Sequence, residues 1–251
     1  MINLRAQTME YLHREFENYS HQRKRGLAFE SVHPFKSHTY LSTLIQIGNY
    51  LPNPQTEPRS LEVGFGSGYL ISLFARLGFR AVGIERDDTA FQYSRAILEE
   101  KMVSALIAKG DGFNLPFKDN TFDIVSSFGM IEHYDLYQQG KLLKEMSRVS
   151  KNLVLVGVPN DNPKSNYQQF KSEKTYIPEV EIIPDLHRSC LEAGLDPIMS
   201  SGCNAILGLD LKGILVNGTL NGDLLLRTEV STPRDTLARK GFLKFTLAKK
   251  N

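Results

Sequence analysis

The sequence predicts an α/β fold built around a mostly parallel sheet, and three observations support this prediction. Short apolar runs alternate with helical segments between residues 59 and 160. The residues suited to chemistry fall where predicted strands end, which is where open α/β sheets bind ligands. Finally, 251 residues with 41% hydrophobic and 23% charged residues suit one globular domain covering residues 1–251.

Composition excludes several classes of protein. A net charge of +2 gives no reason to expect a nucleic acid or a membrane surface as partner. Cys190 and Cys203 form no metal or redox motif, so we expect reduced thiols, no metal site and a cytoplasmic location. No apolar leader precedes the first charges, and residues 206–226 are too polar to span a bilayer. The oligomeric state is not predicted.

Residues 1–58 read as a helical lead-in that serves as a lid. Residues 4–25 have the apolar spacing of an amphipathic helix, with Tyr19 on its apolar face. We expect a loop over residues 26–36 and a second helix with Ser37 as its N-cap.

Residues 59–160 read as the alternating core. The predicted strands cover 61–64, 80–84, 104–108, 122–128 and 153–158. The predicted helices cover about 70–77, 89–102 and 136–149. Gly78 is expected to end the first of these helices as its C′ residue.

Residues 161–251 read as a segment on the acceptor side with closing strands. We expect a helix near 180–194 capped by Gly194, then a strand near 197–206. A helix or irregular insertion is expected over 208–239, followed by a last strand at 242–248.

The end of the first strand carries three glycines at alternate positions, Gly64, Gly66 and Gly68. Glycine tolerates a positive φ and has no Cβ, so a ligand can approach the backbone closely. A helix follows directly, and its unpaired N–H groups face the same crevice. The pattern predicts a pocket for a nucleotide.

The residues at the next two strand ends narrow the class of nucleotide that the predicted pocket would bind. Glu85 follows the second strand, 85 − 64 = 21 positions after the first glycine, where a carboxylate can accept hydrogen bonds from both ribose hydroxyls. Asp111 and Gly112 follow the third strand, where Asp111 can accept from a purine amino group. The fourth strand ends in Phe128 and runs into the segment 129–133.

These residues carry a resemblance to class I S-adenosylmethionine-dependent methyltransferases, in the small-molecule branch called type 11. The stretch from Glu62 to Gly68 resembles the family's first motif, and residues 83–85 resemble its second. Residues 110–125 and the Ile-Glu-His run at 131–133 resemble motifs of that branch. Ser150-Lys151-Asn152 departs from the usual glycine pair at that turn.

The resemblance implies a Rossmann-like three-layer sandwich with a seven-stranded sheet whose last strand is antiparallel. It also implies transfer of a methyl group from S-adenosylmethionine to an oxygen, nitrogen or carbon nucleophile, with S-adenosylhomocysteine as product. Residues 1–58 and 161–240 would then cover the acceptor pocket. The residues that the resemblance places at the cofactor are Glu62, Gly64, Phe65, Gly66, Gly68, Glu85, Arg86, Asp111, Gly112, Phe113, Phe128, Met130 and His133.

His133 is the candidate general base, because imidazole titrates near neutral pH and this position borders the methyl group in the family. It can equally line the pocket or order Glu132. Less direct candidates for the acceptor pocket are His33, His38, Tyr40, Tyr167, Tyr176 and residues 158–160.

Three alternatives remain open. A nicotinamide-dependent oxidoreductase also uses glycines and an acid, but Gly68 comes one position early for that fingerprint. A non-catalytic module that binds S-adenosylmethionine would keep the same motifs. Methylation of a macromolecule is disfavoured against a small-molecule acceptor, because the near-neutral charge offers no phosphate track.

Overall fold

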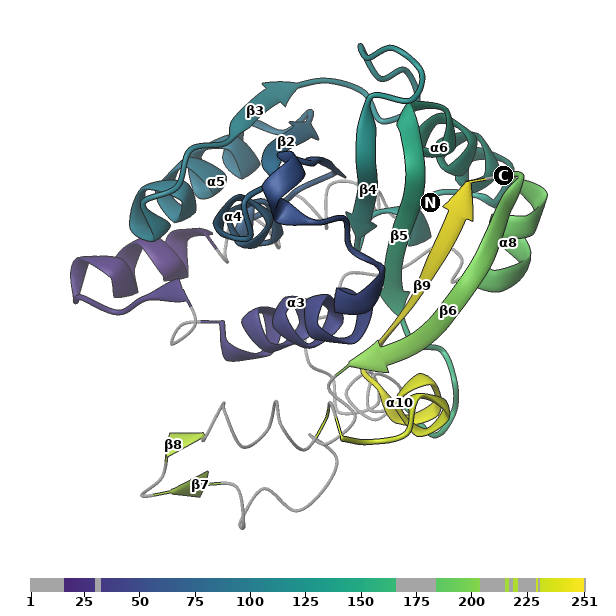
Figure 1. The fold of residues 1–251 in the computed structure, drawn as a ribbon. Coiled ribbons are helices and arrows are strands. Elements are labelled where there is room, and N and C mark those ends of the chain that lie inside the picture. Colours follow the sequence, from purple (N-terminus) through teal and green to yellow (C-terminus); the bar gives the residue numbers. More distant parts are fainter. Residues whose placement is uncertain are drawn as a thin grey trace.

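The computed structural model describes residues 16–29, 33–165, 184–203, 215–216, 219–220, 229 and 231–250. Its main sheet has seven strands in the order β3-β2-β1-β4-β5-β9-β6 (Figure 1). These strands are β1 (Arg59–Val63), β2 (Arg80–Glu85), β3 (Leu106–Lys109), β4 (Phe122–Phe128), β5 (Ser150–Pro159), β6 (Leu195–Cys203) and β9 (Leu243–Lys250).

Strands β1 to β5 pair in parallel, and β9 lies antiparallel between β5 and β6. The predicted mostly parallel sheet with an antiparallel last strand is therefore confirmed. The chain order reverses at β1, which pairs with β2 on one side and β4 on the other. This reversal opens the crevice in which α/β sheets bind ligands.

Helices cover both faces of the sheet (Figure 1). One apolar cluster packs α6 (Leu136–Val149) and α8 (Leu186–Glu192) onto the sheet. A second cluster packs α3 (Pro34–Ile47), α4 (Tyr69–Arg76) and α5 (Asp88–Lys101) onto the opposite face. The three-layer architecture predicted from the sequence is confirmed.

The remaining described elements are short. They are η1 (Gly48–Tyr50), η2 (Pro54–Thr56), η3 (Ile131–His133), α10 (Arg234–Lys240) and the hairpin of β7 (Leu215–Val216) with β8 (Thr219–Leu220). No helix within the described residues is long and apolar enough to cross a membrane.

The N-terminal boundaries differ from the prediction. Helix α3 begins at Pro34 with His33 as N-cap, so Ser37 lies inside the first turn and donates its N–H to the His33 carbonyl. Proline at the first helical position fits because that position needs no N–H donor, and this favours the earlier start. Residues 16–24 are helical and Tyr19 is fully buried, as its spacing predicts.

Several strand bounds shift because pairing, and not local composition, decides where a strand ends. Strand β3 begins at Leu106 rather than residue 104, where its pairing with β2 begins. Strand β6 covers Leu195–Cys203 rather than 197–206, in register with β9. The β7–β8 hairpin lies where a helix or irregular insertion was expected.

Candidate active site

The glycine loop between β1 and α4 has the backbone that its sequence predicts. Gly64, Gly66 and Gly68 have φ values of +71°, +51° and +71°. A Cβ on Gly64 would lie 2.3 Å from Met130 Sδ, and one on Gly68 would lie 2.0 Å from Ser94 Oγ. The loop therefore requires glycine both for its turn and for its close packing.

Glu62 is the penultimate residue of β1, directly before this loop. Its side chain is buried and accepts the backbone N–H of Ile71 in the first turn of α4. Its Oε2 has no hydrogen-bond partner within the part of the chain that the structure describes. Burial, with a smaller contribution from Glu85, raises the pKa of Glu62 well above its ordinary value. Glu62 thus holds the glycine loop against α4, and its Oε2 can still accept a hydrogen bond from a ligand.

Glu85, in the second predicted motif, contacts the glycine loop of the first motif. Its Oε1 accepts the backbone N–H groups of Arg86 at 2.7 Å and Asp87 at 3.3 Å. The same carboxylate accepts the N–H of Gly66. Burial raises the pKa of Glu85, and these three donors oppose that rise. An acid held at this edge has the chemistry that a ribose diol requires.

The loop after β3 is held in shape by the carboxylate of Asp111, which belongs to the same loop. Asp111 Oδ1 accepts the Phe113 N–H at 3.0 Å. Gly112 is closely packed, since a Cβ there would lie 2.8 Å from Val63 Cγ1. The Phe113 ring meets the Tyr134 ring edge-to-face at 5.0 Å between centroids, and Tyr134 Oη accepts from Arg86 Nη2 at 3.0 Å.

Tyr134 therefore links Arg86 and Phe113, two predicted cofactor residues from different loops. The sequence reasoning missed it, although it directly follows His133. Ser94 was also missed; its only signal is its place on the buried face of α5.

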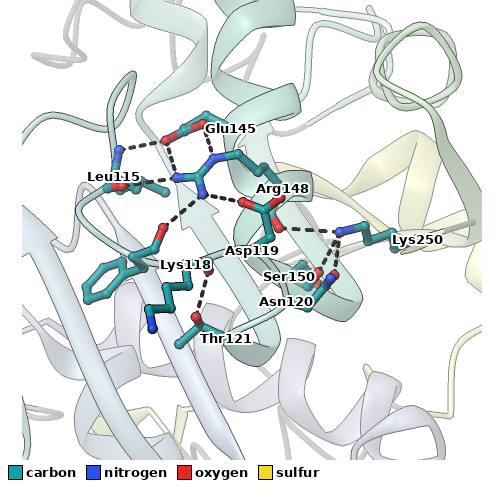
Figure 2. Close-up of polar contacts among 10 residues, drawn as sticks. Leu115, Lys118, Asp119, Asn120, Thr121, Glu145, Arg148, Ser150 and Lys250 are labelled. Carbon is teal, nitrogen blue, oxygen red and sulfur yellow. Dashed lines mark hydrogen bonds and ion pairs between the residues drawn. The ribbon is translucent and has the colours of Figure 1, made fainter.

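Arg148 on α6 holds the stretch that follows Asp111 (Figure 2). Its guanidinium donates to the carbonyls of Leu115 at 3.0 Å and Phe117 at 2.8 Å, and to Asp119 at 2.7 Å. Glu145 pairs with Arg148 at 2.8 Å and accepts the Leu115 N–H at 2.7 Å. Pairing with Glu145 raises the pKa of Arg148 and lowers that of Glu145. We call Arg148 and Glu145 the loop clamp.

The end of β4 contributes residues of different kinds. Met130 lies against Gly64, and Phe128 is buried with its ring against the backbone of Gly157. Glu132 is 2% exposed, whereas His133 is half-buried. The Phe65 side chain is buried and packs edge-to-face against Phe91, so we expect its backbone to face a ligand in the loop.

Helix α3 covers the carboxyl end of the sheet beyond β4. The Tyr40 ring meets the Phe128 ring edge-to-face at 5.5 Å. On the same helix, Ser42 Oγ donates to the buried Glu229 at 2.6 Å, and His38 Nε2 lies 3.1 Å from the same oxygen.

Gln46 on α3 extends this network to β6. Its Nε2 donates to Ser42 Oγ and to the Gly202 carbonyl, both at 3.1 Å. Ser201 Oγ donates to Gln46 Oε1 at 2.5 Å. We call α3 with Ser201, Gly202 and Glu229 the cover.

The other acceptor-side candidates are dispersed. His33 lies among the rings of Tyr19, Phe29 and Tyr93. Asn160 uses its side chain to donate to the carbonyls of Ala238 and Gly241, which gives it a structural task. Tyr167 and Tyr176 lie outside the described residues.

Comparison with known proteins shows which families and folds the chain is similar to. The family described as a methyltransferase domain matches residues 61–154, which include the glycine loop, Glu85, Asp111 and His133. Norajmaline N-methyltransferase from Rauvolfia serpentina is 26% identical over 162 residues, covering 61% of this chain and 53% of that protein. The chain spans about half the length of this curated relative and about a third of a Mycobacterium leprae methyltransferase.

Solved structures share the fold. A methyltransferase dependent on S-adenosylmethionine from Thermotoga maritima aligns with a TM-score of 0.57 and 20% identity, over 95% of this chain and 99% of that one. Magnesium protoporphyrin IX methyltransferase from Synechocystis, with S-adenosylhomocysteine bound, aligns with a TM-score of 0.61 and 11% identity. That alignment covers 97% of this chain and all of the other.

Proposed function

Because residues 61–154 form a class I S-adenosylmethionine-dependent methyltransferase domain, we propose that the protein transfers a methyl group from S-adenosylmethionine to a small molecule. The observation that carries this proposal is the contact of the Glu85 carboxylate with the Gly66 N–H. That contact joins an acid for a ribose to a loop that only glycine can form. Both residues lie inside the matched range.

The residues present fit the cofactor. Glu85 would bind the ribose hydroxyls, and Asp111 with Gly112 and Phe113 would bind the adenine edge. The backbone of the glycine loop would lie along the ribose and the amino acid part. Glu62 Oε2 and the Phe128 carbonyl would accept from the ammonium group, and Arg86 and Met130 would border the site. The bound cofactor supplies a methyl group already activated on a sulfonium.

On the acceptor side, the task of the chain is to align a nucleophile and to exclude water. The cover closes the carboxyl end of the sheet at Tyr40 and Phe128. His133, the half-buried last residue of η3, remains our candidate base. A non-catalytic module with the same cofactor site is the second candidate, since every cofactor residue would be retained in it.

Titration calorimetry with S-adenosylhomocysteine tests the cofactor site. We expect Glu85→Ala and Asp111→Ala each to weaken binding by about 1–3 kcal/mol, the value of a hydrogen bond to a charged group. The control is Glu57→Ala, because Glu57 is an exposed acid that pairs with Arg80 on the surface. Unchanged affinity in both site variants, or tight binding of NAD in place of S-adenosylhomocysteine, would refute the assignment.

A further inference from the structure

Glu132 is a buried acid that neither the core nor the cofactor residues make use of. It lies in η3, immediately after β4, and is 2% exposed. Among the described residues, its carboxyl accepts its own backbone N–H alone, and its Oε2 has no hydrogen-bond partner. A buried carboxyl with an oxygen lacking a donor is costly, so its presence needs a reason.

The surroundings of Glu132 do not supply that reason. Burial raises the pKa of its carboxyl to about 8, and no charged side chain of the described residues offsets this effect. Glu62, the comparable acid of β1, accepts from the first turn of α4. Glu132 has no such helix N–H and differs in that respect.

The position of Glu132 is next to open surface and to the cofactor loop. A Cβ on Gly129 would lie 3.8 Å from Glu132 Oε1, and Gly129 is exposed with a φ of +68°. Two residues earlier in the turn, Met130 lies on Gly64 of the glycine loop. The carboxyl therefore lies beside an exposed glycine, which has no side chain to block approach, and within one short turn of Met130, which contacts the glycine loop.

We propose that Glu132 binds the methyl acceptor and that this acceptor is an amine. An alkylammonium group supplies both a donor for Oε2 and the positive charge that an ionised buried carboxylate lacks. A neutral hydroxyl supplies only the donor, and a carboxylate acceptor would be repelled. This inference rests on the proposed methyl transfer and specifies its substrate class.

The proton balance suits an amine. As the ammonium binds, the Glu132 carboxyl releases its own proton to solvent. The bound ammonium then passes one N–H proton to the resulting carboxylate, which leaves a neutral amine and a neutral carboxyl. Burial favours this pair over two charges, because it penalises the ionised acid. The freed nitrogen lone pair then forms the N–C bond while the electron pair of the C–S bond goes to sulfur. The positive charge passes to the methylated nitrogen, which can lose a proton to solvent.

The test uses the full chain saturated with S-adenosylmethionine and three matched probes: 2-phenylethylamine, 2-phenylethanol and phenylacetate. Parallel sets with propyl and indolylethyl skeletons vary the size. We expect release of S-adenosylhomocysteine with amines and not with the alcohols or acids. Glu132→Gln should lower kcat/KM for the best amine about 100-fold, the usual contribution of a proton-transfer group. Glu57→Gln, at an exposed acid, is the control and should change nothing.

Each possible result of this test either supports or overturns the proposal for Glu132. The variant should bind S-adenosylhomocysteine as the parent does, which also reports that it is folded. Lost affinity for S-adenosylhomocysteine would assign Glu132 to the cofactor and overturn the proposal. Methylation of an alcohol or acid in preference to amines, full activity of Glu132→Gln, or binding and methylation of no amine would also overturn it. Failure of the parent itself to bind S-adenosylhomocysteine would instead refute the proposed function.

Discussion

The cofactor edge and the cover meet at the end of β4 but are built in different ways. At the cofactor edge, defined by residues 62–68, 85–87 and 111–117, most acid–donor pairs are close in sequence. Asp111 accepts from a residue two positions away, and Glu85 from the next two. In the cover, Ser42 bonds Glu229 and Gln46 bonds Ser201, at separations of 187 and 155 residues.

The difference teaches why one region can be read from motifs and the other cannot. A loop that satisfies its acids with neighbouring N–H groups needs particular residues at fixed spacing. A cover that satisfies its polar groups across the chain leaves only scattered Ser, Gln and Glu in the sequence. Glu132 lies between the two regions, and no described residue of either kind donates to its Oε2.

The largest expected effect is at Glu132, between the cofactor edge and the cover, where the free energy of unfolding should depend on pH. Burial raises the pKa of Glu132 from its ordinary 4.5 to about 8. Between these values the folded protein retains a proton that the unfolded chain releases, so the free energy of unfolding falls as the pH rises. Glu132→Gln has no such proton and escapes this loss. The free energy of unfolding of Glu132→Gln should therefore match that of the parent below pH 4 and exceed it by on the order of 4 kcal/mol at pH 8.

Urea unfolding of both proteins across this pH range measures the effect. Glu57→Gln, at an exposed acid, should run parallel to the parent at every pH. A Glu132→Gln profile that also ran parallel to the parent would mean that Glu132 is ionised in the fold.

At the cofactor edge, Gly68→Ala tests whether the loop is as constrained as its local bonds suggest. The alanine Cβ would lie 2.0 Å from Ser94 Oγ and hold a positive φ. We expect a loss of about 3 kcal/mol in the free energy of unfolding, from left-handed backbone and overpacking together. Gly26→Ala also has a positive φ but nothing within 4 Å, so it should lose only about 1 kcal/mol. If Gly68→Ala and Gly26→Ala lose the same free energy of unfolding in chemical denaturation, the Ser94 side chain moves aside for the new Cβ.

The loop clamp is the part of the cofactor edge that depends on a distant element. Arg148→Met removes the donor to two loop carbonyls and the ion-pair partner of Glu145, which keeps only its hydrogen bond from the Leu115 N–H among the described residues. We expect a loss of about 2 kcal/mol in stability, together with weaker binding of S-adenosylhomocysteine. Arg188→Met, which breaks only an exposed pair with Glu192, should stay within about 0.5 kcal/mol of the parent. If binding is unchanged, the clamp does not position residues 111–113.

The smallest effect is expected in the cover. Ser42→Ala removes one donor to buried Glu229 and one acceptor for Gln46. The loss should be about 1–2 kcal/mol, because Glu229 keeps its contact with His38. Thr56→Ala breaks an exposed local bond and should cost about 0.5 kcal/mol or less. Thermal unfolding compares the two, and an equal effect would mean that the cover contributes no more than a surface turn.

The sequence by itself predicted the glycine loop and the acids at the strand ends, because the physics of these features is local. Gly64, Gly66 and Gly68 predicted a turn with positive φ, and the alternation of apolar runs predicted the parallel sheet with its ends at one edge. The placement of Glu85 at the end of β2 followed from spacing alone, since a strand and a helix of ordinary length separate it from the loop.

Only the tertiary structure decided how the rest assembles. Pairing with β9 set the extent of β6, and Pro34 moved the start of α3 ahead of Ser37. Tyr134 joined Arg86 to Phe113, and Glu229 came under α3, because side chains far apart in sequence meet only after the sheet has formed. The burial of Glu132 is likewise a property of the packed turn: the Ile-Glu-His run names the residue, but desolvation by the surrounding fold gives it its chemistry.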